Sequence, residues 1–197
     1  MATQKSRALW VVATLALALS GAAAATVRRV GSDEMSPSIK AGEHVVLLPL
    51  SPIRGDVVAL ADPLDPARVV LRRAIAGGGQ RVTYENGELR VDVKRVRQKE
   101  MTLLGPERVT QETMWSKPPA RANNWLLRYR KEGVKWKAPA VLVPEGSWYL
   151  LADDRDGSLD SRWWGPIAED RLMGVVRLRW GEADTWRPSV EILNPIP

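Results

Sequence analysis

The 197-residue chain has the length of one domain, and its 45% hydrophobic and 26% charged residues are typical of a globular protein. It contains no cysteine and one histidine, His44, which excludes disulfides and thiol nucleophiles and argues against a histidine-based metal centre or a Ser-His-Asp triad. The net charge of +6 arises in residues 84–143, which hold 13 Lys and Arg against 7 Asp and Glu, whereas the remainder holds 16 of each sign. We therefore expect a local basic surface, and no metal and no cofactor.

The N-terminal segment predicts a membrane-associated protein. Residues 1–7 are polar and basic, and residues 8–27 contain no charge. A helix of this length spans about 30 Å, the thickness of a bilayer core. Basic residues before the span favour a cytoplasmic N-terminus and a single-pass anchor with the body on the extracytoplasmic side.

A cleaved signal peptide is the alternative, because Leu9–Leu19 has the length of its apolar core and residues 22–25 resemble a cleavage site. Both interpretations place the body outside the cytoplasm, so we expect no nucleic-acid partner.

Beyond the apolar segment, short apolar runs alternate with Gly, Pro and Asn turns, a pattern typical of a mostly β fold. Asn86-Gly87 predicts a tight hairpin turn, and residues 167–172 one helical turn. Strands are expected at residues 44–48, 57–60, 69–75, 81–84, 89–93, 141–143, 148–151 and 175–180.

Residues 84–140 have the weakest periodicity of the body. They are basic, contain Trp115, Trp125 and Trp136, and are interpreted as an inserted subdomain between the two core segments, 28–83 and 141–181. Residues 182–197 form a short tail. The basic surface of the insert either contacts anionic lipid or an acidic partner, or is a solvated charged face.

A charge-dense loop, Ala152–Gly165, follows the strand predicted at 148–151. Asp and Ser side chains cap turns by bonding nearby backbone. Arg155 and Arg162 have acidic neighbours on both sides, so the sequence predicts a loop that satisfies its own charges.

Four segments, in this order, resemble the motifs of the type I signal peptidase family, which are membrane-tethered endopeptidases with a Ser/Lys dyad. The segments are Gly31–Ile39, Arg54–Val58, Arg72–Gln80 and Ala152–Gly165. The resemblance implies a signal-peptidase-like β body with an inserted subdomain after one transmembrane helix. It also implies signal-peptide-bearing or other exported polypeptides and membrane lipid as partners.

Both dyad positions depart from the family pattern. Glu34 stands at the position of the nucleophilic Ser, and Arg72 at that of the general-base Lys. Ser32 flanks the first position, but Met35 and Pro37 set the register. The resemblance therefore identifies a family whose reaction groups are exchanged here.

The exchange predicts loss of the reaction. Arg remains protonated and cannot accept the proton of a nucleophile. Glu34 attacking a carbonyl would form an anhydride, and no base would activate water for the second step. The two charges are complementary, and the resemblance implies that the two dyad positions adjoin, so we expect Glu34 and Arg72 to form a bidentate salt bridge.

Three alternatives stay open. In the first, the charges of Glu34 and Arg72 both point to solvent and never meet. In the second, the protein is a different hydrolase in which Glu34 acts as a general base on water. The third is an active signal peptidase with displaced groups, for which Lys40 is the only Lys near the first motif.

The resemblance also assigns supporting roles. It places Ser32 in an oxyanion hole, Met35 near pockets for small side chains, and Ser158 near the dyad Lys, and it pairs Arg73 with Asp160 while Arg162 braces the loop. The function this predicts is a catalytically inactive signal-peptidase-like membrane protein that binds exported polypeptides or assists their assembly. The alternative is an active serine endopeptidase that removes signal peptides.

Overall fold

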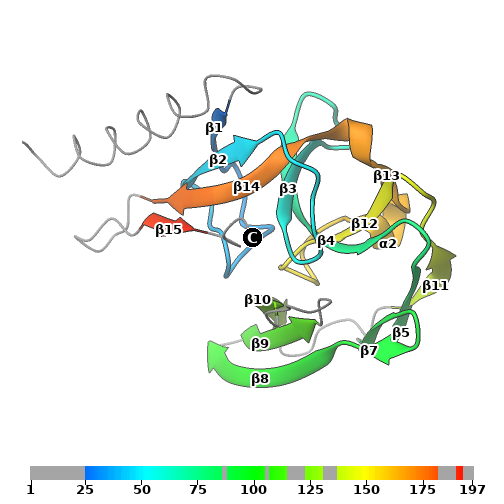
Figure 1. Cartoon of the computed structure of the whole chain (residues 1–197). Helices are drawn as coiled ribbons and strands as arrows, with labels where there is room; N and C mark the ends of the chain where they lie inside the picture. Colours follow the sequence, from blue (N-terminus) through cyan, green and yellow to red (C-terminus); the bar gives the residue numbers. More distant parts are fainter. Residues whose placement is uncertain are drawn as a thin grey trace, which may run out of the picture.

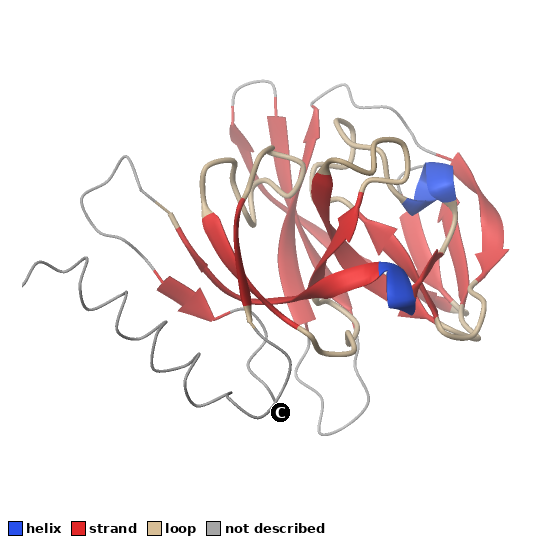
Figure 2. Cartoon of the chain, turned by 90° about the horizontal axis from the view of Figure 1, so that it is seen from above, coloured by secondary structure: helices blue, strands red, loops and turns tan. Residues whose placement is uncertain are grey.

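The computed structural model describes residues 25–85, 88–104, 107–114, 123–130, 137–181 and 190–192, and these residues are mostly β. The two helical segments among them are short: α2 (Ser161–Trp164) and the 3-10 turn η1 (Glu169–Arg171) (Figure 2). The strands are β1 (Thr26–Arg29), β2 (His44–Leu48), β3 (Val57–Ala61), β4 (Val69–Gly77), β5 (Arg81–Glu85), β6 (Glu88–Val91), β7 (Lys94–Arg95), β8 (Arg97–Leu104), β9 (Glu107–Met114), β10 (Asn123–Arg130), β11 (Lys137–Leu142), β12 (Ser147–Leu151), β13 (Ile167–Ala168), β14 (Leu172–Trp180) and β15 (Val190–Ile192).

The largest sheet has the strand order β1-β2-β14-β3-β4-β12-β13, with β15 paired to β14 (Figure 1). Its strands pair antiparallel. Both faces are covered, because alternate β3 residues enter different hydrophobic clusters. Val57 and Ala59 join the cluster containing Met35, and Val58 and Leu60 join the one containing Leu150. Burial on both faces explains why these strands read as continuous apolar runs.

Two smaller sheets, β11-β5-β6-β7 and β10-β9-β8, contain the described part of the insert. One hydrophobic cluster joins them to the body: Tyr84 and Leu127 pack with Ile75 and Leu151, and all four side chains are fully buried. The described parts of residues 84–140 therefore share a core with the body.

Most strand predictions are confirmed, including those at β2, β3, β4, β12 and β14. The Asn86-Gly87 turn lies outside the described residues, although Glu85 pairs with Glu88 as a two-residue hairpin requires. The helical turn predicted over 167–172 is wrong in its first residues, because Ile167–Ala168 is extended and pairs with β12.

The predicted anchor, 8–27, lies outside the described residues up to position 24, as do residues 1–7. Its last two residues are strand, because Thr26–Arg29 pairs with β2. In the part of the chain that the structure describes, no helix is long and apolar enough to cross a bilayer.

Candidate functional site

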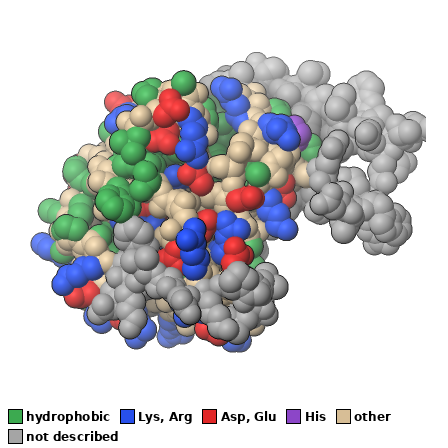
Figure 3. Space-filling view, turned by 180° about the vertical axis from the view of Figure 1, so that it is seen from behind, with side chains coloured by type: hydrophobic (Ala, Val, Ile, Leu, Met, Phe, Trp, Pro, Cys, Tyr) green, Lys and Arg blue, Asp and Glu red, His purple; other side chains and the backbone are tan. Residues whose placement is uncertain are grey.

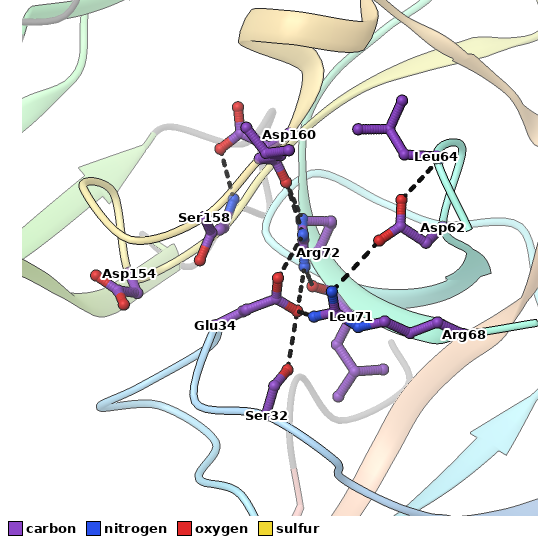
Figure 4. A network of polar contacts seen from close by, with 12 residues as sticks. Ser32, Glu34, Asp62, Leu64, Arg68, Leu71, Arg72, Asp154, Ser158 and Asp160 are labelled. Atoms are coloured by element: carbon purple, nitrogen blue, oxygen red, sulfur yellow. Dashed lines mark hydrogen bonds and ion pairs between the residues drawn. The ribbon is translucent and has the colours of Figure 1, made fainter. Parts of the chain in front are cut away.

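Glu34 and Arg72 meet at the centre of the site (Figure 4). Glu34 lies in the loop between β1 and β2, and Arg72 lies in the middle of β4, opposite Val58 of β3. Arg72 Nη2 is 3.2 Å from Glu34 Oε1, and Arg72 Nη1 is 3.4 Å from Glu34 Oε2. The predicted bidentate pair therefore forms, and the alternative in which both charges point to solvent is wrong.

The remaining donors of Arg72 are bound to backbone oxygens. Its Nε and Nη2 donate to the carbonyl of Leu159 at 2.9 and 2.6 Å, and Nη1 donates to the carbonyl of Leu71 at 2.6 Å. The guanidinium also lies 5.2 Å from the ring centroid of Trp164 and has no exposed surface. This permanently charged group is held in one geometry.

The Glu34 carboxylate has two further partners. Arg68 Nη2 lies 2.6 Å from Glu34 Oε2, and Ser32 Oγ donates to the same oxygen at 2.8 Å. Burial alone would raise the pKa of Glu34, but the charge of Arg72 and hydrogen bonds from Arg72, Ser32 and Arg68 outweigh it and hold the pKa below its ordinary value. A carboxylate stabilised in this way is a weak base and a weak nucleophile.

Sequence reasoning missed Arg68, which links Glu34 to Asp62 through a contact of 3.5 Å between Arg68 Nη1 and Asp62 Oδ2. The signal was available. Arg68 immediately precedes β4, and even spacing along a strand places it on the same side as Arg72. Figure 4 shows the two arginines reaching Glu34 from this strand and its preceding turn.

A cavity of about 290 Å³ adjoins the carboxylate. Apolar side chains, among them Val45, Ala59 and Leu71, form part of its lining, together with Ser32 and Met35. Met35 is 1% exposed. The cavity has the size for a small apolar group beside a charged one.

The predicted pair between Arg73 and Asp160 is wrong. Arg73 Nε donates to Asp153 Oδ1 at 2.8 Å, Nη2 binds Asp153 Oδ2, and Nη1 donates to the carbonyl of Gly55 at 2.8 Å. The reason is the register of β4 with β12: Leu151 lies opposite Arg73, so the chain leaving β12 brings Asp153 to the guanidinium.

Asp160 instead closes the motif loop on itself. It caps α2 by accepting from Arg162 N at 3.0 Å, and it binds Arg162 Nε and Nη2 at 2.8 Å each. Its Oδ2 also accepts from Ala152 N at 3.0 Å. The prediction that this loop satisfies its own charges is confirmed at Asp160.

On the surface, Figure 3 shows basic and acidic side chains side by side on the face seen from behind.

Ser158 lies in the same loop and is buried, and its Oγ has no hydrogen-bond partner among the described residues. It precedes Leu159, whose carbonyl holds Arg72. In the described ranges, no three His, Asp or Glu side chains are grouped as metal ligands.

Sequence comparison shows which family the chain belongs to. The sequence model of the family described as signal peptidase, peptidase S26, matches residues 3–181. The chain belongs to this family.

Relatives of this S26 member carry the name signal peptidase I. A probable signal peptidase I-1 of Synechocystis sp. is 26% identical over 81% of this chain and 72% of its own length. The signal peptidase I of Aquifex aeolicus is 25% identical over 85% of this chain and 80% of its length. A solved signal peptidase I from Enterococcus faecalis has 20% identity and a TM-score of 0.39, over 65% of this chain and 98% of that one.

Proposed function

We propose that this S26 family member does not hydrolyse signal peptides by a Ser/Lys mechanism, and that it binds exported polypeptides at the former catalytic cleft. One observation carries the proposal: the Glu34 carboxylate is clamped between Arg72 and Arg68, at 3.2 and 2.6 Å. The site is occupied by a structural ion pair at the two positions where the reaction requires a nucleophile and a base.

Neither partner can replace the dyad. Arg72 stays charged at all relevant pH values, and its donors are bound to Glu34, Leu71 and Leu159. The lowered pKa of Glu34 also opposes a role as general base on water, which requires a pKa near the working pH. Loss of the nucleophile in an unrelated serine protease costs about 10⁶-fold in kcat.

Binding is compatible with the geometry that remains. The cavity beside Glu34 has the size for a small apolar side chain, and Met35 is part of its lining. An extended polypeptide can add to a sheet edge by main-chain hydrogen bonds without being cut. The client is an exported, signal-peptide-bearing polypeptide. The protein is held by a lipid-embedded N-terminal anchor within residues 8–25, before β1, with its body on the extracytoplasmic side.

A second candidate is an active signal peptidase in which Ser32 is the nucleophile. One contact favours it, because Ser32 Oγ donates to Glu34 Oε2 at 2.8 Å, as a nucleophile does to its base. The lowered pKa of Glu34 weakens that base. Lys40, the Lys nearest to the first motif, has an exposed side chain.

The test uses the purified full chain in detergent with a fluorogenic signal-peptide substrate and an active signal peptidase I as positive control. We expect no turnover above that of Ser32→Ala, together with saturable binding of the uncleaved peptide by fluorescence anisotropy. Turnover abolished by Ser32→Ala would establish the second candidate. Turnover that needs Glu34 but not Ser32 would establish a carboxylate-based hydrolase.

A further inference from the structure

The face formed by β7, β8 and β9 carries an open groove of about 770 Å³. These strands belong to the two smaller sheets, whereas Arg72 lies in the largest sheet. Its lining contains four cationic side chains and no carboxylate. The lining residues are Lys94, Arg95, Arg97, Gln98, Lys99, Gln111 and Thr113.

Strand register explains how the charges come to one side. Glu112 of β9 is fully buried, and exposed Gln98 lies opposite it in β8 and donates from its Nε2 to Glu112 Oε1 at 2.9 Å. Because successive side chains of a strand point to opposite faces, the neighbouring pairs face outward. These are the pairs Arg97 with Thr113 and Lys99 with Gln111.

Part of the positive charge of the groove is neutralised locally. Arg95 has an acidic neighbour, with Arg95 Nη2 2.7 Å from Glu88 Oε1. Arg97 and Lys99 are exposed and form no ion pair within the described residues. Positive potential therefore concentrates along β8.

We propose that this groove binds an extended polypeptide segment with acidic side chains at alternate positions. Arg97 and Lys99 are two residues apart, which along a strand is about 6.6 Å, the spacing of every second side chain on a bound strand. β8 is also an edge strand of the three-stranded sheet, so its outer side offers a template for main-chain pairing. Charge complementarity and strand geometry thus select the same ligand.

An acidic polypeptide fits this location better than a lipid surface. Figure 1 places β8 and β9 at the opposite end of the molecule from β1, the strand that directly follows the proposed anchor. The groove therefore lies away from the strand that follows the proposed anchor. The site is thus separate from the cleft proposed above, and it does not depend on whether that cleft is active.

The experiment measures anisotropy of a labelled peptide in which Glu alternates with Thr, added to the full chain at low salt. Replacing Arg97→Gln together with Lys99→Gln is expected to weaken binding about tenfold, the loss of two exposed charge contacts. The matched control is Arg81→Gln with Arg171→Gln, which removes the same charge from exposed positions outside the groove. This control is expected to bind within about twofold of the parent protein.

Two further arms decide the outcome. The first measures binding of a peptide with the same composition in which the Glu residues form one block. The second measures binding of phosphatidylglycerol vesicles, and both use the two double variants. Weaker binding of the blocked peptide supports the alternating register. Equal loss in both variants, or vesicle binding that depends on Arg97 and Lys99 without binding of the alternating peptide, overturns the proposal. Unchanged thermal unfolding of the variants excludes misfolding as the cause.

Discussion

Arg155 and Glu112 form an ion pair in which neither side chain has any exposed surface, with Arg155 Nη2 2.7 Å from Glu112 Oε2. Arg155 belongs to the motif loop and Glu112 to β9 of the insert. Burial alone would lower the pKa of Arg155, but Glu112, together with Tyr129, Tyr84 and Asp153, outweighs this effect and raises that pKa above its ordinary value. The pair therefore joins the motif loop, which is the most family-specific segment, to the insert, which has the weakest hydrophobic periodicity.

Glu112→Ala is expected to lower the free energy of unfolding by about 3–5 kcal/mol, because it leaves the charge of Arg155 buried without its partner. Chemical denaturation of the full chain measures the change. Glu88→Ala is the matched control, because the ion pair of Glu88 with Arg95 is exposed. The Glu88 side chain is 36% exposed and the Arg95 side chain is 60% exposed. An exposed pair contributes about 0–1 kcal/mol. Equal effects of the two changes would contradict a special role for the buried pair.

The ion pair of Glu34 predicts a pH dependence of stability. Its pKa is lowered in the folded protein from an ordinary value of 4.5, so the contribution is fully present above about pH 4.5. It is lost as the pH falls through the folded-state pKa. Glu34→Gln is expected to be less stable than the parent protein by roughly 1–3 kcal/mol near neutral pH, because Arg72 loses its charged partner.

Denaturation of both proteins at a series of pH values checks this prediction. The difference between them should shrink as the pH falls below 4.5. A difference that stays constant down to strong acid would mean that Glu34 gains nothing from its ionised form in the folded state.

The combined change Glu34→Ser with Arg72→Lys is expected to restore signal-peptide cleavage. Arg68 remains beside the site, with its Nη2 2.6 Å from Glu34 Oε2 in the parent protein. Its charge would lower the pKa of the new amine at position 72 and favour the neutral, proton-accepting form. A positioned general base typically raises the reaction rate by about 10²–10⁴-fold. The fluorogenic assay should therefore show a rate at least about 100-fold above the parent background.

Each single change is the control for this experiment, because one dyad member alone lacks either the nucleophile or the base. Cleavage by Glu34→Ser alone would assign the base to another group. Absence of cleavage in a folded double variant would show that the cleft has lost more than the dyad.

Gly174 in β14 allows a close approach to β2. Its φ is +145°, and a Cβ at this position would lie 2.8 Å from the carbonyl oxygen of Leu48. Gly174→Ala is expected to destabilise the protein by roughly 1–3 kcal/mol, because the backbone is strained and the two strands must separate. Thermal unfolding measures the effect. Gly31→Ala is the control, since nothing lies within 4 Å of a Cβ there and its φ is not positive; a similar loss in both would argue against strain at Gly174.

Much of the site could be predicted from the chain alone. The motif segments identify the family, and the complementary charges of Glu34 and Arg72 predict their contact, which the structure contains. The apolar runs at β2, β3 and β4 predict strands because burial on both faces leaves a continuous hydrophobic pattern. The strand predictions depend on local residue order, and the contact between Glu34 and Arg72, which are 38 residues apart, follows from the dyad positions of the family that the motifs identify.

The strands β8 and β9 could not be predicted in the same way, because polar residues occur on both of their faces. In β10 the signal was available, because Trp125, Leu127 and Tyr129 alternate with more exposed residues and are buried. Glu112 is buried only because Arg155, 43 residues later in the chain, neutralises it. Local patterning cannot show a charge that is paired from so far away.

Tertiary structure alone decided the partner of Arg73, which is Asp153. Alternation along β4 places Arg72 and Arg73 on opposite faces, and this is readable from the sequence. Which carboxylate Arg73 meets depends on the strand register: Leu151 opposite Arg73 brings Asp153, and not Asp160, to that guanidinium. Register is set by long-range pairing and packing, so the sequence by itself determined the family and the exchanged dyad, and the fold decided how those charges are held.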